Sequence, residues 1–87
     1  MGKVVYTVIV RPRARKQLKK IPRQYRTKIT SALRYLAHDP FSGKRLTGEH
    51  KGEYALRVWP YRIIYIIEKK RVTVFVLAIG HRQAVYK

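Results

Sequence analysis

Three runs of β-branched and aromatic residues in the second half of the chain constrain its fold most. The runs cover residues 54–58, 61–68 and 72–79, and only the short segments 59–60 and 69–71 separate them. Such a composition favours β-strands, and connections this short join strands that are antiparallel neighbours. The sequence therefore predicts a three-stranded antiparallel meander.

The first half of the chain predicts one further strand and two helices. Residues 4–10 (VVYTVIV) have a strand composition and end before Pro12, which cannot donate a ladder hydrogen bond but suits the first turn of a helix. Apolar residues then recur at helical spacing over residues 12–21. A second helix is expected from Pro22 to the segment 38–40 (HDP).

These elements occur in the order strand, helix, helix, strand, strand, strand. We expect an α+β fold in which a mostly antiparallel four-stranded sheet carries the two N-terminal helices on one face. Residues 40–52 contain three glycines and predict a long loop. A chain of 87 residues suffices for one core, so residues 1–87 should form one domain, with the other sheet face open to a nucleic-acid strand or a peptide.

The charge of the chain indicates a negatively charged partner. There are 21 Lys and Arg against 4 Asp and Glu, a net charge of +17 that a polyanion or an acidic protein would neutralise. Cysteine is absent, so nothing indicates an oxidising compartment. The longest apolar run, residues 63–67, is far shorter than the ~20 residues that span a bilayer. We expect a cytoplasmic protein without membrane contact.

The polar residues exclude several kinds of enzyme site. The four carboxylates form no spaced pair, and the three histidines lack a zinc-binding spacing. No glycine-rich phosphate loop is present. We therefore expect neither a metal nor a cofactor.

Three arginines and a tyrosine remain as candidates for chemistry. Arg57 and Arg62 lie on neighbouring strands of the meander, and Arg82 and Tyr86 follow the last strand. Guanidinium groups that converge on one phosphate can stabilise the charge of a phosphorane transition state. Because nearby cations favour phenolate, Tyr86 is a candidate proton acceptor. RNA supplies its own nucleophile, the 2′-hydroxyl, so such a site can cut RNA without a metal.

Further residues are candidates for substrate binding. They are the loop cations Lys44, Arg45 and Lys51, together with His81 and the base-stacking candidate Trp59. Each also has a structural interpretation, because strand and helix cations are commonly solvated and Trp59 can pack at a turn. The same holds for Arg57 and for Tyr86, which can pack the C-terminal tail onto the sheet.

Several segments together resemble the RelE toxins of type II toxin–antitoxin modules. They are residues 52–58 (GEYALRV), 61–65 (YRIIY) and 79–86 (IGHRQAVY), with 19–22 (KKIP) and 38–40 (HDP). The resemblance implies an endoribonuclease that enters the ribosomal A site and cuts messenger RNA by 2′-hydroxyl attack. It also implies a RelB-like acidic antitoxin, and contact with operator DNA only through the antitoxin complex.

The resemblance also assigns roles by position. Arg62 and Arg82 would hold the scissile phosphate, Arg57 would assist, and Tyr86 would orient or deprotonate the nucleophile. Where the ribosome-dependent pattern has two lysines, this chain has Ala55 and Arg57. The general base therefore stays open between Tyr86 and two other residues, Lys51 and His81.

Two other functions are compatible with the sequence. ParE-like toxins share the superfamily fold but inhibit DNA gyrase, and they do not need an RNase site. A non-catalytic module that binds RNA or the ribosome would also explain the charge. Arg62, Arg82 and Tyr86 together favour the RNase.

Overall fold

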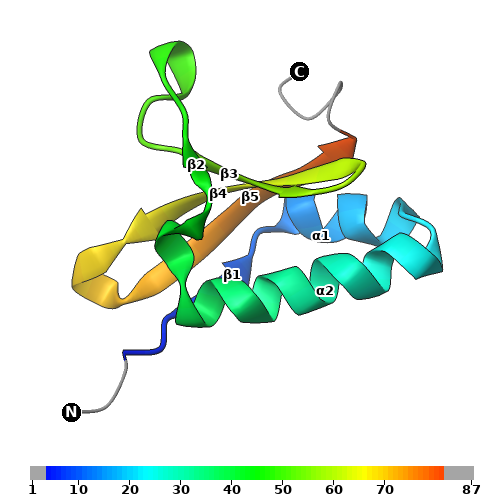
Figure 1. Ribbon diagram of the computed structural model, residues 1–87, viewed down its shortest axis with the longest axis horizontal. Helices are drawn as coiled ribbons and strands as arrows, with labels where there is room; N and C mark the ends of the chain where they lie inside the picture. The colour runs from blue at the N-terminus through cyan, green and yellow to red at the C-terminus, as the bar shows by residue number, and fades with distance from the viewer. Residues whose placement is uncertain (1–3, 82–87) are drawn as a thin grey trace.

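The structure of the protein, a computed structural model, describes residues 4–81. Two helices cover one face of a five-stranded sheet (Figure 1). The elements are β1 (Thr7–Val10), α1 (Pro12–Lys20), α2 (Arg23–His38), β2 (Lys44–Arg45), β3 (Tyr54–Val58), β4 (Tyr61–Glu68) and β5 (Thr73–His81). Short 3-10 helices, Pro40–Ser42, Gly48–His50 and Lys69–Arg71, lie in the connections.

The α+β class is confirmed, but the expected four-stranded, mostly antiparallel sheet is wrong in two respects. The strand order is β1-β5-β4-β3-β2, so the sheet has five strands, and β1 runs parallel to β5. The two helices between β1 and the meander carry the chain back across the sheet, which permits this parallel pairing. The fifth strand, β2, lies within the expected loop and pairs Lys44 with Ala55 and Arg45 with Tyr54.

Prolines and apolar spacing set the helices as the sequence predicts. Pro12 occupies the first turn of α1, and Pro22 is the residue before α2. The apolar side of each helix packs on the sheet, where the helices contribute Ala14, Ile29, Leu33 and Leu36 to the main buried core. No helix within residues 4–81 is both long and apolar enough to cross a membrane.

Helix α1 also completes the hydrogen bonding of β5 beyond the end of β1. The last β1–β5 register pair is Val10 with Val76. Further along β5, the N–H of Ile79 donates to Oε1 of Gln17 at 2.8 Å. A helix side chain thus takes the place of a neighbouring strand near the end of β5.

Tyr65 on β4 fastens the β2 segment to the sheet. Its side chain is fully buried, and its hydroxyl donates to the carbonyl of Pro40 at 2.8 Å and accepts from the N–H of Gly43 at 3.1 Å. Its ring stacks on Tyr54 with 5.4 Å between the centroids. Because buried polar groups are costly without partners, these two hydrogen bonds fix residues 40–43 against the sheet.

Gly43 is required by this close approach. A Cβ atom at this position would collide with the Tyr65 hydroxyl and would lie 3.0 Å from the carbonyl oxygen of Ala55. Neither neighbour can move freely, because one is buried and the other is backbone of β3. The chain can therefore pass from Pro40 to β2 along this path only with glycine here.

We expect Tyr65→Phe to lower the free energy of unfolding by about 1–3 kcal/mol, because the Gly43 N–H and the Pro40 carbonyl lose their partner. Urea denaturation at pH 7 measures this change. Tyr35→Phe is the matched control, since its exposed hydroxyl donates to Oδ2 of Asp39 at 3.1 Å. It should cost no more than about 0.5 kcal/mol. Equal losses in the two variants would contradict the anchoring role of Tyr65.

The same tyrosine predicts a pH dependence at the alkaline end. Burial raises the pKa of Tyr65 to about 12 from its ordinary value of 10.0. The folded state then retains this proton while the unfolded chain loses it, so the contribution is complete below pH 10 and is lost as pH rises towards 12. Unfolding measured from pH 9 upward should show a steeper loss for the wild type than for Tyr65→Phe. Parallel curves would show that folding does not perturb Tyr65.

Candidate functional site

Arg57 and Arg62 face each other across two neighbouring strands. They are register partners in the β3–β4 hairpin, so their side chains leave the sheet on the same side. The alternate residues of these strands, such as Leu56 and Ile63, pack in the core beneath the helices. Arg57 and Arg62 therefore lie on the sheet face opposite the helices, which we call the open face.

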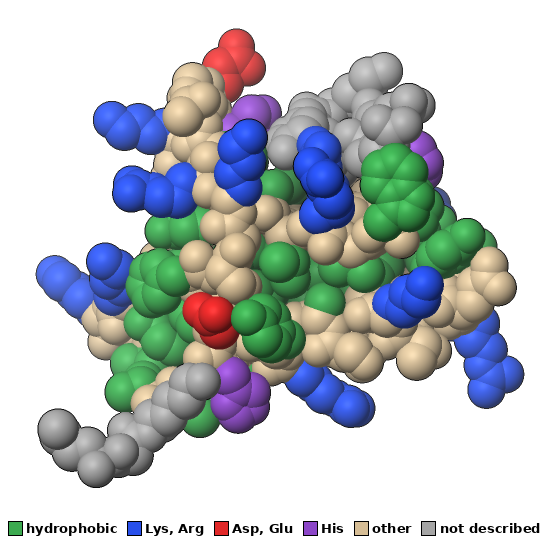
Figure 2. Space-filling model, viewed as in Figure 1, with side chains coloured by type: hydrophobic (Ala, Val, Ile, Leu, Met, Phe, Trp, Pro, Cys, Tyr) green, Lys and Arg blue, Asp and Glu red, His purple; other side chains and the backbone are tan. Residues whose placement is uncertain are grey.

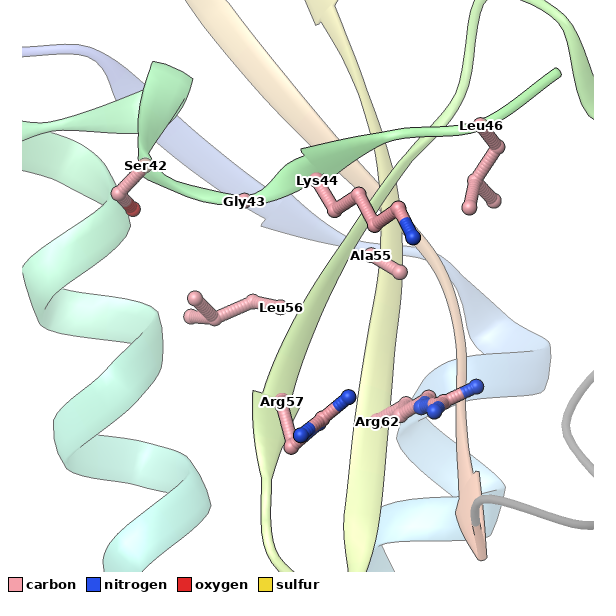
Figure 3. A pocket seen from close by; sticks show the side chains of 8 residues that line it. All are labelled: Ser42, Gly43, Lys44, Leu46, Ala55, Leu56, Arg57 and Arg62. Carbon is pink, nitrogen blue, oxygen red and sulfur yellow. The ribbon is translucent and has the colours of Figure 1, made fainter.

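The two arginines border a shallow depression of about 420 Å³ on the open face (Figure 3). We call it the arginine depression. Figure 3 shows the Lys44 side chain on the same side of the sheet, reaching across Ala55. The lining residues are Ser42, Gly43, Lys44, Leu46, Ala55, Leu56, Arg57 and Arg62.

The lining is strongly positive. It includes three cations, Lys44, Arg57 and Arg62, and none of the lining residues is acidic. Like charges placed directly opposite each other on a sheet are destabilising. An oxyanion between the guanidinium groups would remove this repulsion and could accept bidentate hydrogen bonds from them. The arrangement therefore fits a phosphate group.

The Tyr65 anchor determines that Lys44 belongs to this site. Gly43, held by the Tyr65 hydroxyl, directly precedes β2, and the register places Lys44 beside Ala55 on β3. Paired strand residues share a face, so Lys44 lies on the open face two positions along β3 from Arg57. The structure thus brings together three of the predicted site residues from β2, β3 and β4.

Two predicted substrate-binding residues lie elsewhere. Arg45 pairs with Tyr54, whose side chain packs against the core, so Arg45 belongs to the helix side of the β2 edge. Lys51 follows the Gly48–His50 turn and is exposed. Neither residue lines the arginine depression.

His81 and Trp59 also lie away from the arginine depression. His81 is the register partner of Tyr61, and the two rings meet edge to face with centroids 6.1 Å apart, which places His81 on the helix side. Trp59, at the β3–β4 turn, is 61% exposed and therefore accessible to a base. The predicted catalytic residues Arg82 and Tyr86 lie outside the described residues.

Sequence reasoning missed part of the depression. Ser42, Gly43 and Leu46 line it although none carries a chemical signal in the sequence. They reach it because the Pro40–Ser42 turn and β2 lie against β3. Gly43 is one of three glycines in residues 40–52, and its interaction with Tyr65 could be found only in three dimensions.

A second depression of about 390 Å³ has a different character. Its lining mixes the apolar side chains of Ile9, Ile66 and Phe75 with basic ones, and the guanidinium of Arg11 lies 5.0 Å from the centre of the Phe75 ring. We call it the Phe75 depression. The remaining lining residues are Val10, Pro12, Arg15, Glu68 and Arg71.

Comparison with known proteins gives the family. The family model described as the ParE toxin of the type II toxin–antitoxin system parDE matches residues 8–86. Toxin RelG of Mycobacterium tuberculosis is 32% identical over 84 residues, which cover 94% of this chain and 97% of that protein. The match thus extends over nearly the whole of both chains.

Solved structures agree in fold. The toxin–antitoxin complex RelBE2 from Mycobacterium tuberculosis contains a chain with a TM-score of 0.86 and 31% identity, covering 93% of this chain and 95% of that one. The isolated E. coli RelE toxin gives a TM-score of 0.73 and 26% identity, with coverage of 87% and 83%. These findings confirm the resemblance seen in the sequence. The chain belongs to the RelE/ParE superfamily of type II toxin–antitoxin toxins.

Proposed function

We propose that this toxin is an endoribonuclease that inhibits translation by cutting messenger RNA. The observation that carries the proposal is the facing pair Arg57 and Arg62 in a depression without acidic lining residues. Such a pair suits the phosphate of a strand lying on the open face. Similarity to RelG and to the RelE toxins supports the same activity.

In the proposed reaction the RNA attacks its own backbone. The 2′-oxygen forms a bond to phosphorus while the bond from phosphorus to the 5′-oxygen breaks. The products are a 2′,3′-cyclic phosphate and a 5′-hydroxyl end. One protein group must accept the 2′-proton and another must donate a proton to the leaving 5′-oxygen.

Arg57 and Arg62 would stabilise the extra negative charge of the phosphorane, with Lys44 holding a neighbouring phosphate oxygen. Arg82 and Tyr86 would add a third guanidinium and a proton-transfer group. Of the three candidates for the general base, Lys51 and His81 do not line the arginine depression, so the proposal favours Tyr86. RNA brings the nucleophile and the arginines neutralise charge, so the proposed reaction uses no metal or other cofactor.

The proposed setting is the cytoplasm, with the ribosome presenting the messenger RNA in its A site. A RelB-like acidic antitoxin would neutralise the toxin, and contact with operator DNA would occur only through that complex. The solved complexes of similar toxins with RelB antitoxins support such a partner. The proposed function involves no membrane.

We further propose the Phe75 depression as a contact of the antitoxin. Stable protein interfaces bury apolar anchors within a polar rim. Ile9 is 42% exposed there, and Phe75 lies beneath Arg11, so an acidic segment with an aliphatic side chain is complementary in both shape and charge. An antitoxin seated there would cover the same face as the arginine depression.

Gyrase inhibition is the second candidate function. The family model that matches residues 8–86 bears the ParE description, which favours it. A gyrase inhibitor would give no reason for Arg57, Arg62 and Lys44 to line one depression on the open face. A supercoiling assay run beside the RNA assay separates the two functions.

We expect Arg62→Gln to slow messenger RNA cleavage on programmed ribosomes by about 100-fold or more, as removal of a transition-state donor does. Primer extension maps the cuts, and single-turnover rates give the loss. Arg45→Gln is the matched control, because it removes the same charge from the helix side of the β2 edge. Similar losses of cleavage rate in the two variants would mean that Arg62 contributes only general electrostatic attraction for RNA. Intact RNA with blocked gyrase would assign the chain to the ParE-like class.

We expect Ile9→Asp to weaken neutralisation by the antitoxin without removing toxicity, because a carboxylate would replace the exposed apolar anchor. Growth with and without coexpressed antitoxin, together with copurification of the pair, measures this. Tyr35→Asp places the same charge at a position 51% exposed on α2 and should leave neutralisation intact. Full neutralisation of the Ile9 variant would remove the Phe75 depression from the interface.

A further inference from the structure

The outward side of α2 carries a third depression, of about 340 Å³, which no step of the proposed reaction uses. We call it the α2 groove. It is lined by Arg23, Arg26, Thr27, Thr30, Ser31 and Arg34. Helix α2 covers one face of the sheet (Figure 1). Arg57 and Arg62 leave the sheet on the other face, so the groove and the arginine depression belong to different sides of the molecule.

The two helices carry basic residues but no acidic ones. Five Lys or Arg residues lie in α1 and four lie in α2, and neither helix contains an Asp or Glu. In Figure 2, Lys and Arg side chains project from many parts of the visible surface, whereas few acidic side chains are seen. Like charges one helical turn apart, such as Arg23 and Arg26, destabilise a helix. The helices thus retain a repulsion that an external polyanion would relieve.

The position of two of these arginines increases that cost. The first turn of α2 contains no acidic residue, although the positive end of the helix dipole favours one there. Instead Arg23 and Arg26 occupy the first helical turn. A selection for helix stability alone would have placed carboxylates at these positions, so a bound anion is a better explanation of the arginines.

The shape of the groove suits a polyanion backbone. The hydroxyls of Thr27 and Thr30 donate to the carbonyls of Arg23 and Arg26 at 3.2 and 2.9 Å, which keeps these short side chains close to the helix. The longer arginines therefore extend beyond these hydroxyls along the same side of the helix. From Arg23 to Arg34 the helix advances about 16 Å, at 1.5 Å per residue, which is enough for several phosphates.

The lining also distinguishes RNA from a protein partner. None of the six lining side chains is apolar, whereas protein interfaces need apolar anchors at their centre, as the Phe75 depression offers. Interfaces with a nucleic-acid backbone are polar and strongly positive. Double-stranded RNA is bound largely through its phosphates and 2′-hydroxyls, without entry of side chains into its deep groove.

We propose that the α2 groove binds the phosphate backbone of double-stranded RNA while the open face of the sheet holds a single strand. The proposal rests on the proposed RNase function. It gives this chain a second RNA-binding surface, which holds it on a folded RNA while the arginine depression meets a separate strand. A toxin that acts only on the ribosome, which consists largely of RNA, would need such a surface.

The test uses a 2′-O-methylated RNA duplex, which the proposed reaction cannot cut because no 2′-hydroxyl is present. The test variant is Arg23→Gln, Arg26→Gln, Arg34→Gln, since Gln keeps a helix propensity close to that of Arg. A control variant of equal charge changes Arg45, Lys69 and Lys70 to Gln, three exposed cations that lie outside both helices. Affinity is measured by fluorescence anisotropy over a range of salt concentrations.

We expect the helix variant to bind the duplex at least about tenfold more weakly. Its log–log salt slope should fall by about 0.7–0.9 for each phosphate that the variant no longer binds. The control variant should keep most of the affinity and slope, and Arg57→Gln, Arg62→Gln should also keep duplex binding. Equally weakened duplex binding in the helix and control variants would overturn the proposed groove. The net positive charge of the chain would then explain the binding.

Two further readouts separate this proposal from the others. Loss of antitoxin copurification by the helix variant, with duplex binding intact, would overturn the proposal and assign the groove to protein. A chain that binds the duplex through α2 but cuts no messenger RNA would support the groove and contradict the RNase function. If the helix variant cleaves messenger RNA normally on ribosomes and keeps its affinity for the duplex, the groove proposal is wrong and the RNase proposal stands.

Discussion

The hydroxyl of Tyr65 is the interaction on which the geometry of the candidate site depends. It lies in the buried core, yet it accepts from Gly43 and donates to Pro40, both on the segment that leads to β2. The hydrophobic effect alone would bury this ring in several orientations, but two directional hydrogen bonds fix one path for the chain. That path places Lys44 on the open face beside Arg57 and so completes the positive lining.

The two faces of the sheet serve different purposes because successive side chains of a strand point to opposite faces. On β4, Ile63 and Tyr65 enter the main core while Arg62 and Ile64 leave on the open face. A register shift of one residue would bury Arg62 and expose Tyr65. The core therefore fixes the direction of the arginine, and the stability of the fold and the geometry of the site cannot be separated on this strand.

The sequence predicted the regular elements well and the irregular ones poorly. The bounds of β3 and β4 agree with the predicted runs, because alternation and short turns are local signals. The parallel partner of β1 and the strand at Lys44–Arg45 were missed, since pairing between distant segments leaves no local pattern. Among the site residues, Arg57 and Arg62 were placed by strand register. His81 was not, because the irregular pairing between β4 and β5 near Ile64 and Tyr65 changes which side the end of β5 presents.

The acidic residues explain why the positive charge remains available to partners. Glu53 lies 3.3 Å from His50, Glu68 lies 3.3 Å from Arg71, and Asp39 accepts from Tyr35, so three of the four acids interact within four residues of themselves. None of the four lines the arginine depression or the α2 groove. Since a ligand that binds only the folded state stabilises it, RNA or an acidic antitoxin would also relieve the repulsion that folding leaves. Fold stability and partner binding are then two consequences of one uneven distribution of charge.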